Sequence, residues 1–263
     1  MAAAKTESNS RAARILNLLV ENARIAREQK IPLCQDTGLA VVFVEQGCDV
    51  TVAGDNGRTP MAIGEAVNAG IRAGYEKGYL RSSVVTEPLK ERKNTGTNTP
   101  AIIHHFVVPG DRLRISVMAK GGGCENRSRF RMFRPTAERI EIIEWVVEVV
   151  RSAGADACPP FVVGVGLGGD FELSCLLSKK ALLRRLDEPQ RPSGMGIGVD
   201  RYYADLEAEM LSRINGLGLG PQGLGGDTTA LAVLIETAGC HIASLPAAVN
   251  IECHSHRHKS AVL

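Results

Sequence analysis

The pattern of apolar and polar positions along the chain predicts a series of amphipathic helices. The clearest one covers residues 11–30 and stops before Pro32, because proline cannot continue a helix. Its apolar residues recur three to four positions apart, which places them on one helix face: Ile15, Leu18, Leu19, Ala23 and Ala26. Further helices are predicted over residues 62–77, 137–153, 171–186 and 205–215.

Short apolar runs between turn-forming residues predict strands. The runs cover residues 39–44, 49–53, 101–108, 112–119, 161–167, 230–236 and 247–252. The strands at 101–108 and 112–119 flank Pro109-Gly110-Asp111, which predicts that they pair as a hairpin. The polar segment 92–100 and the proline- and glycine-rich segment 188–199 are predicted loops.

The mixture of hairpins and helices predicts a mixed α/β (α+β) fold, a single domain of small mixed sheets with surrounding helices. No internal repeat and no long linker interrupts the chain. We therefore expect this domain to span residues 11–263, after a disordered or tag-like N-terminus at residues 1–10.

The bulk composition narrows the class of partner. Of 263 residues, 44% are hydrophobic and 23% are charged, as in globular proteins that bury a sizeable core. A net charge of +2 and an aromatic content of 4% favour neither a nucleic-acid nor a membrane-surface partner. No apolar run approaches the ~18 residues of a membrane-spanning helix, and the N-terminus lacks a secretory signal. We expect a cytoplasmic location.

Glycine clusters mark places where a backbone can approach a ligand, or simply tight turns. Residues 164–169 read GVGLGG and match the dinucleotide fingerprint G-x-G-x-x-G. Asp187 and Glu188 even lie near the spacing of a ribose-binding acid. However, Asp170 would place a negative charge where the pyrophosphate rests. Nicotinamide binding is therefore the less favoured interpretation.

The seven cysteines divide by their local sequence. Cys34, Cys158 and Cys253 fall at the ends of predicted elements, beside loops in which a site would be assembled. Three such thiolates can hold three irons of a [4Fe–4S] cluster, although spacing this wide has little specificity alone. The remaining thiols lie within or beside ordinary elements and are expected to be packed in the core: Cys48, Cys175 and Cys240. Cys124, after three glycines, is ambiguous.

The C-terminal tail offers a different metal chemistry. Cys253 is followed by His254, His256 and His258, and cysteine and histidine are the usual ligands of zinc. Alternating residues of a strand project to one side, so the three imidazoles could converge. The alternative is a frayed histidine-rich terminus.

Several longer strings occur in an order that resembles a known family. They are PLCQDTG (32–38), NTGTNTPA (94–101), KGGG (120–123) with EN (125–126), ACPP (157–160), GPQGLGG (220–226) with TTAL (228–231), HIASLP (241–246) and NIEC (250–253). Together they closely resemble the alpha subunit of two-subunit class I fumarate hydratases and the N-terminal domain of single-chain class I fumarases. The sister family is L-tartrate dehydratase. The resemblance runs from about residue 11 to the end.

The resemblance implies a set of site residues. It implies an oxygen-sensitive [4Fe–4S] cluster held by Cys34, Cys158 and Cys253. It also implies catalytic roles for Asp36 and His241, in which Asp36 exchanges a proton with the substrate hydroxyl. Contacts to a small dicarboxylate map to Gln35, Arg81, Gly121, Gly122 and Gly123. An arginine and glycine amides are suitable partners for carboxylates.

The resemblance also implies a partner. In the family a C-terminal domain or beta subunit supplies the threonine base and further cationic contacts, so this chain alone is expected to bind a cluster and to turn over little. We expect an alpha2beta2-type assembly or an alpha homodimer that hydrates fumarate to malate reversibly. The alternatives are an L-tartrate dehydratase alpha subunit and a non-catalytic metal-binding module.

Two residues within or beside the quoted strings depart from the family pattern. Family members usually have serine where this chain has Cys124, and glutamine where it has Glu252. Two interpretations of the extra thiol stay open: it has no special role, or it makes the cluster region more sensitive to oxidation.

Overall fold

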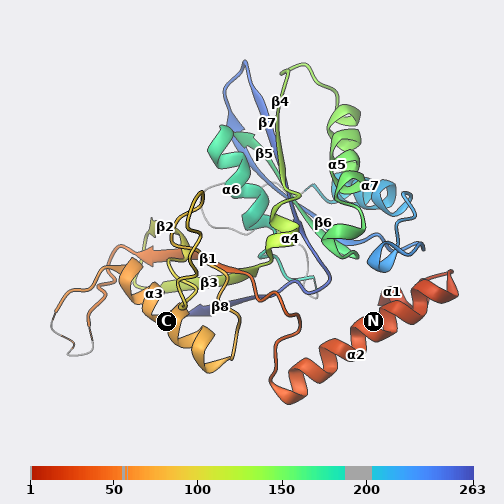
Figure 1. Ribbon diagram of the computed structural model, residues 1–263. Coiled ribbons are helices and arrows are strands. Elements are labelled where there is room, and N and C mark those ends of the chain that lie inside the picture. Colours follow the sequence, from red (N-terminus) through yellow and green to blue (C-terminus); the bar gives the residue numbers. More distant parts are fainter. Residues whose placement is uncertain (1, 55–56, 58, 187–202) are drawn as a thin grey trace. The chain divides into compact units, whose positions relative to one another are not determined.

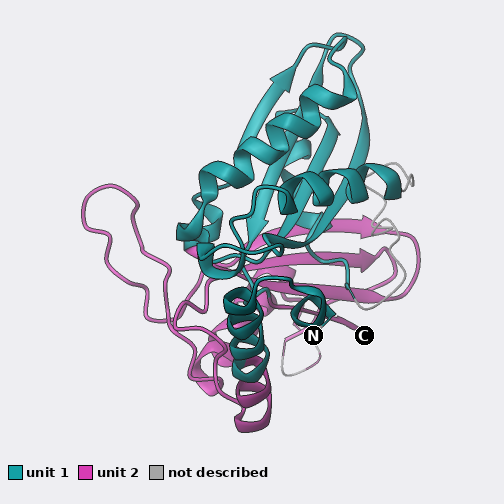
Figure 2. Ribbon diagram, turned by 90° about the vertical axis from the view of Figure 1, so that its right-hand side faces the viewer, with its two compact units in different colours: residues 1–22, 123–256 teal, residues 23–122, 257–263 magenta. Residues whose placement is uncertain are grey.

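The computed structural model describes residues 2–54, 57, 59–186 and 203–263, which form helices and two four-stranded sheets (Figure 1). The predicted mixed α/β class with small mixed sheets is therefore confirmed. The chain forms two compact units (Figure 2). Unit 1 contains residues 1–22 and 123–256, and unit 2 contains residues 23–122 and 257–263. The local sequence pattern gave no sign of this division.

Unit 2 is built on a sheet with the strand order β2-β1-β3-β8. Its strands are β1 (Leu39–Gly47), β2 (Ile102–Val108), β3 (Leu113–Lys120) and β8 (His258–Val262). β1 pairs parallel with β2 and antiparallel with β3, and β3 pairs antiparallel with β8. Helix α3 (Ile63–Lys77) connects β1 to β2 and packs Val67, Ile71 and Tyr75 into the core of this unit.

The predicted hairpin between β2 and β3 is wrong, because β1 lies between them. β1 is buried over most of its length and fills the centre of the sheet, where both of its sides are hydrogen-bonded. Where β1 ends, the backbone bonds to the end of β2 and to the residue before β3: Cys48 N donates to Val108 O, and Gly47 N donates to Arg112 O. The buried strand β1 thus separates the two strands that the turn sequence predicted to be neighbours.

The predicted strand at residues 49–53 is also wrong. Only Ala53 forms an isolated bridge, with Pro60. The chain turns immediately after β1, where Val50 N donates to Gly47 O, so this apolar run finds no neighbouring strand. The predicted loop at 92–100 contains no helix or ladder strand in the structure.

Unit 1 is built on a sheet with the strand order β4-β7-β5-β6. Its strands are β4 (Arg129–Phe133), β5 (Phe161–Gly169), β6 (Ala230–Cys240) and β7 (Leu245–Glu252). β5 pairs parallel with β6 and antiparallel with β7, and β7 pairs antiparallel with β4. Helices α5 (Arg139–Ala153) and α7 (Ala204–Asn215) bury one face, and α6 (Phe171–Ala181) covers the other (Figure 1).

The glycine fingerprint lies inside β5 rather than in a loop after it. Val163 and Val165 face the core shared with α5 and α7, whereas Gly164 and Gly166 face α6. A Cβ on Gly166 would lie 2.0 Å from Ser174 O, so these glycines permit close helix–sheet packing. The Asp170 side chain caps α6 by accepting from Leu173 N at 2.8 Å. The pattern is thus explained by packing, and Asp187 and Glu188 lie outside the described residues.

The N-terminal residues differ from the expected disordered segment. Residues Ala2–Thr6 form the short helix α1, and α2 follows at Ser10–Gln29. The carboxylate of Glu7 accepts hydrogen bonds from Asp227 N and from the N and Oγ1 atoms of Thr228, at 2.7–3.0 Å. A polar N-terminal sequence can be ordered in this way, because its side chains supply partners to a glycine-rich loop.

Short helices connect the larger elements of unit 1. They are α4 (Gly122–Glu125), η1 (Ala155–Ala157) and η2 (Pro221–Gly223). Within the described ranges no helix combines the length and the hydropathy needed to cross a bilayer. The predicted loop at 188–199 lies outside those ranges.

Candidate functional site

The predicted site residues are shared between the two units. Unit 2 contains Cys34, Gln35, Asp36, Arg81, Gly121 and Gly122. Unit 1 contains Gly123, Cys158, His241 and Cys253. Each group is described within its own unit.

In unit 2, Asp36 joins the turn before β1 to the residues after β3. Its Oδ1 accepts from Gly38 N at 2.8 Å, which is the turn-stabilising role of an aspartate at this position. Its Oδ2 accepts from Gly122 N at 3.0 Å. The sheet register pairs Leu39 with Lys120, so the start of β1 lies opposite the end of β3. We call this the β1–β3 end of the unit 2 sheet. The structure thus brings Asp36 together with Gly121 and Gly122.

Arg81 is held beside the same turn through backbone contacts. Thr37 Oγ1 donates to Arg81 O at 3.0 Å. Asn98, which is fully buried, accepts from Ser83 N at 2.6 Å and donates to Gly38 O at 3.1 Å. The side chains of Arg81 and Gln35 are exposed. They are therefore available to a ligand at the β1–β3 end.

Two residues at the β1–β3 end were missed by the sequence analysis. Arg257 Nη2 donates to Asp36 O at 3.0 Å. The hydroxyl of Tyr75 lies 3.0 Å from both Thr37 O and Gly38 O. Burial raises the pKa of Tyr75 above its ordinary value, with Arg257 opposing and Asp36 adding to the rise, so the phenol stays protonated and donates. Both side chains contact backbone carbonyls, and no sequence motif predicts such contacts.

In unit 1, Cys158 lies where β5 is about to begin. It has a left-handed backbone (φ 56°, ψ 65°), between η1 and a cis peptide that joins Pro159 to Pro160. A non-glycine residue in this conformation costs about 1–2 kcal/mol, and such strain often accompanies functional positions. The side chain of Cys158 is exposed.

Cys253 reaches the same end of the sheet from the opposite direction. The register pairs Val162 of β5 with Glu252 of β7. We call this the β5–β7 end of the unit 1 sheet. His254 N lies 3.4 Å from Cys158 O and links the two cysteine segments directly. The structure therefore brings Cys158 and Cys253 together within unit 1.

Gln222, which the sequence analysis did not select, fixes this arrangement. Its N and Nε2 atoms donate to Pro159 O at 2.8 and 2.9 Å. Nε2 also lies 3.1 Å from Nδ1 of His254. Gln222 is within the quoted string GPQGLGG, but only the structure shows that it spans the segments of Cys158 and Cys253.

The environment of Cys253 favours the thiolate. Its Sγ is 2.9 Å from Ser255 Oγ. The hydrogen bond with Cys124 is the largest cause that lowers the pKa of the Cys253 thiol, to about 5; Ser255 adds to this effect and burial opposes it. Cys124 Sγ also lies 3.4 Å from Ala157 O, and its single proton can be directed to either acceptor. Because thiolates are the form that binds metals, this environment is suited to a ligand.

A group of potential ligand atoms surrounds Cys253. The ligand atoms of Cys124, Glu252 and Cys253 all lie within 4.8 Å of one another. Cys124 is 4% exposed and Glu252 is 1% exposed. The sequence analysis left Cys124 undecided, and the structure places it directly beside a predicted cluster ligand.

The other cysteines correct one expectation. Cys48 and Cys240 are exposed and not packed in the core, because Cys48 follows β1 and Cys240 is the last residue of β6. Cys175 is half-buried, and burial raises the pKa of its thiol.

The tail histidines have separate partners. Nε2 of His256 lies 2.8 Å from Leu182 O, whereas His254 is placed beside Gln222 and Cys158. Neither belongs to the metal-ligating group found among the described residues. His258 is the first residue of β8 in unit 2. The structure therefore gives no support to a zinc site in this tail.

His241 lies at the other end of the unit 1 sheet. It follows β6 and precedes β7, and its Nδ1 accepts from Ala243 N at 3.1 Å. The whole of β7 separates it from Cys253, which corresponds to about 24 Å of extended chain. The structure does not bring His241 together with Cys158 and Cys253. Gly123 is exposed, and a Cβ on it would lie 3.8 Å from Asp156 O.

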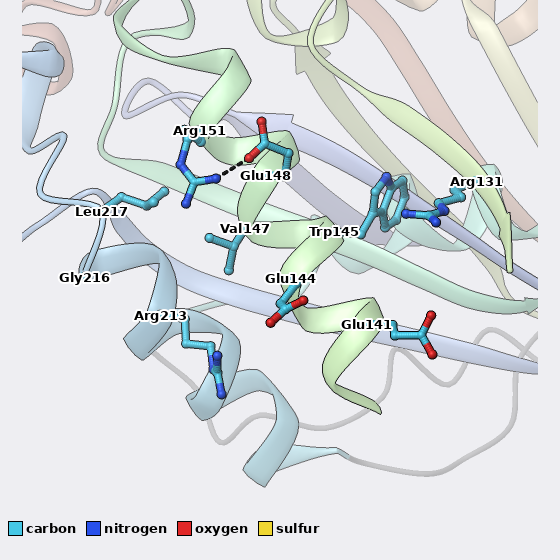
Figure 3. Close-up of a pocket in the computed structure, with 10 residues that line it drawn as sticks. All are labelled: Arg131, Glu141, Glu144, Trp145, Val147, Glu148, Arg151, Arg213, Gly216 and Leu217. Atoms are coloured by element: carbon cyan, nitrogen blue, oxygen red, sulfur yellow. Dashed lines mark hydrogen bonds and ion pairs between the residues drawn. The ribbon is translucent and has the colours of Figure 1, made fainter. Parts of the chain in front are cut away.

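Unit 1 also has a groove of about 800 Å³ between β4, α5 and α7 (Figure 3). Its lining alternates acidic and basic side chains around Trp145, and Arg151 pairs with Glu148. None of the predicted site residues lines it. Helical surfaces with mixed charges of this kind usually face solvent.

Comparisons with known proteins agree with the motifs. A model of the family described as "Fumarate hydratase (Fumerase)" matches residues 1–262. A putative L(+)-tartrate dehydratase subunit alpha of Methanocaldococcus jannaschii is 40% identical over 256 residues, which cover 96% of this chain and 85% of that protein. The L(+)-tartrate dehydratase subunit alpha of Escherichia coli strain UTI89 is 30% identical over 253 residues, 95% of this chain and 78% of that protein.

Proposed function

Because this chain belongs to the fumarate hydratase (Fumerase) family, we propose that it is the alpha subunit of a [4Fe–4S]-dependent hydro-lyase that hydrates fumarate to malate reversibly. The observation that supports this most directly is the match to the family over residues 1–262. The geometry adds that candidate residues gather at the β1–β3 end of unit 2 and at the β5–β7 end of unit 1.

The donor set suits the cluster. We assign Cys34 of unit 2 and Cys158 and Cys253 of unit 1 as ligands. Cys253 is disposed to be a thiolate, Cys158 is exposed on a strained backbone, and Cys34 is half-buried in the turn that contains Asp36. A cluster held by three cysteines keeps one iron open as a Lewis acid for a carboxylate and a hydroxyl.

The proposed substrate contacts follow from charge and hydrogen-bonding capacity. Arg81 is exposed and can form a bidentate pair with one carboxylate of a dicarboxylate. Gln35 and the amides of the Gly121–Gly123 turn offer neutral donors. The carboxylate oxygens of Asp36 each accept one backbone hydrogen bond and retain a second lone pair with which to exchange a proton with the substrate hydroxyl.

His241 completes the proposed catalytic set on the basis of its motif. Its distance along β7 from Cys253 makes its substitution an informative test. In the proposed role, His241→Gln lowers kcat/KM at unchanged iron content. An unchanged kcat/KM would remove His241 from the site.

The proposed partner is a beta subunit that supplies the base for the carbon-bound proton. The relatives are named as alpha subunits, which supports a two-subunit enzyme. We propose an assembly of alpha2beta2 type, or an alpha homodimer that recruits beta subunits, located in the cytoplasm.

L(+)-tartrate is the second candidate substrate, because both relatives are named as tartrate dehydratase subunits. Both candidates are four-carbon dicarboxylates, so Arg81 and the glycine amides would suit either. A non-catalytic metal-binding module is the candidate of another class, and it predicts no turnover with any partner.

The decisive experiment purifies the chain anaerobically together with its beta subunit. Iron content and absorption of the iron–sulfur chromophore are recorded, and fumarate and L-tartrate are assayed in parallel. We expect about four irons per chain and turnover of one substrate. Absence of iron, or iron retained after Cys34, Cys158 and Cys253 are all replaced by serine, would refute the ligand assignment. Full activity of the chain alone would refute the need for a partner.

A further inference from the structure

We propose that Cys124, Glu252 and Cys253 form a mononuclear site for a thiophilic divalent cation, with Zn²⁺ as the expected ion. The three ligands all lie within unit 1. The site shares only Cys253 with the cluster ligands.

The geometry is close to that of a tetrahedral ion. Two zinc–sulfur bonds of about 2.3 Å at a tetrahedral angle place their sulfur atoms about 3.8 Å apart. The three ligand atoms already lie within 4.8 Å of one another. They therefore need to approach one another by only about 1 Å or less to bind zinc directly.

Two separate segments hold the ligands in place. Cys124 lies in the short helix α4, and its Sγ contacts Ala157 O just before Cys158. Glu252 ends β7 and is paired in register with Val162 of β5. Cys253 follows directly and is hydrogen-bonded to the buried Ser255. This hydroxyl is a suitable neighbour for a metal-bound sulfur, since it donates without occupying the metal.

The chemistry of the set selects the ion. Two thiolates and one carboxylate match the sulfur and oxygen ligands of zinc, and the hard ions Mg²⁺ and Ca²⁺ prefer oxygen alone. Three protein ligands leave a fourth position for water.

A functional consequence follows from the shared cysteine. An ion held by Cys253 occupies a thiolate that the cluster needs, so the two metals compete for this chain. Zinc would then protect the thiols of the cluster-free protein and would delay cluster insertion.

The test uses the full chain, freed of iron with a chelator and kept reduced and anaerobic. Co²⁺ serves as the spectroscopic probe for zinc, because thiolate ligation gives charge-transfer absorption and a tetrahedral site gives intense visible bands. We expect one equivalent of Co²⁺ to bind and Zn²⁺ to displace it. Cys124→Ser and Glu252→Gln should each weaken binding by at least about tenfold, since each removes a ligand.

Matched variants separate this site from the cluster ligands. Cys34→Ser and Cys158→Ser should leave Co²⁺ affinity within about twofold, as should Cys240→Ser, an exposed thiol of the same unit. Binding that is lost in Cys34→Ser and Cys158→Ser would overturn the proposal, because the cluster cysteines would then hold the ion. Unchanged binding in both Cys124→Ser and Glu252→Gln would overturn it as well.

Two further measurements keep the result decisive. Circular dichroism confirms that each variant is folded, and zinc should raise the melting temperature of the wild-type chain more than that of Glu252→Gln. Iron content after cluster reconstitution is measured on the same variants. A wild-type chain that takes up Co²⁺ but no iron would contradict the proposed function and leave this site intact.

Discussion

The sheets of the two units share one topology and differ in the chemistry at corresponding ends. In each, a central strand (β1 or β5) pairs parallel with the next strand and antiparallel with the one after, and a further antiparallel strand lies at the border. In each, candidate residues gather where the central strand begins and its antiparallel neighbour ends, and His241, at the other end of the unit 1 sheet, is the exception. The end in unit 2 presents Asp36, Gly122 and Arg257, whereas the end in unit 1 presents Cys124, Cys158 and Cys253.

One backbone arrangement thus presents two different sets of chemical groups in this chain. In both sheets, the segment before the central strand (β1 or β5) lies beside the segment that follows its antiparallel neighbour (β3 or β7). Oxygen, amide and guanidinium groups in those segments suit a carboxylate, and sulfur suits a metal. If the division is real, substitutions at the two ends will affect iron content and turnover separately.

The largest effect is expected from Cys253→Ser in the complex with the beta subunit. It removes a proposed cluster ligand, so iron content should fall below about a tenth of wild type, with loss of turnover. Iron analysis and the hydratase assay measure both, and Cys175→Ser is the matched control at a half-buried thiol. A Cys253→Ser enzyme with normal iron would break the assignment of metal chemistry to unit 1.

Asp36→Asn tests the β1–β3 end of the unit 2 sheet. We expect kcat to fall about 10²-fold or more while iron content stays normal, because an amide cannot exchange the proton. Asp111→Asn, at an exposed turn of the same unit, should leave kcat unchanged. Loss of iron in Asp36→Asn would show that the two ends are not separable.

Arg257→Ala should have an intermediate effect. It removes the charged donor to Asp36 O and is expected to cost about 1–3 kcal/mol of stability. The loosened turn should lower kcat more than it raises KM for substrate, at normal iron content. Arg257→Lys, which keeps one donor, should recover part of both losses, and a variant equal to wild type in kcat and in urea unfolding would contradict a positioning role.

The smallest effect is expected from Tyr75→Phe, measured as a change in pH dependence. Burial raises the folded-state pKa of Tyr75 above the ordinary tyrosine value of 10.0, so this residue stabilises the fold below pH 10. That contribution is lost as pH rises through the folded-state pKa. The free energy of unfolding of wild type should therefore fall more steeply above pH 10 than that of Tyr75→Phe, and parallel curves would count against the buried phenol.

Much of the local structure was predictable because it depends on neighbouring residues. The periodic stretches at 11–30, 62–77 and 205–215 became α2, α3 and α7 with ends shifted by one residue. The hairpin prediction was wrong because β1 pairs in parallel with β2. This pairing joins segments about 60 residues apart, and no turn sequence encodes it.

The candidate site shows the same contrast between residues that a local motif identifies and residues that only long-range contacts identify. Asp36 and Gly122 were selected from motifs, and a hydrogen bond joins them. Gln222, Arg257 and Tyr75 were missed because they act on backbone carbonyls of distant segments, which carry no side-chain signature. His241 was selected from its motif. It precedes β7, and the strand order places it at the end of the unit 1 sheet away from Cys253.

The course of the chain through the units has a consequence for biosynthesis. The turn that contains Asp36 is made early, but β8 and Arg257, which complete the sheet and hold that turn, follow the whole of unit 1 in the chain. A nascent chain must therefore pass all of unit 1 through the ribosome before unit 2 can close. We expect the Asp36 turn to remain open during synthesis, so that an incomplete chain never presents a finished β1–β3 end.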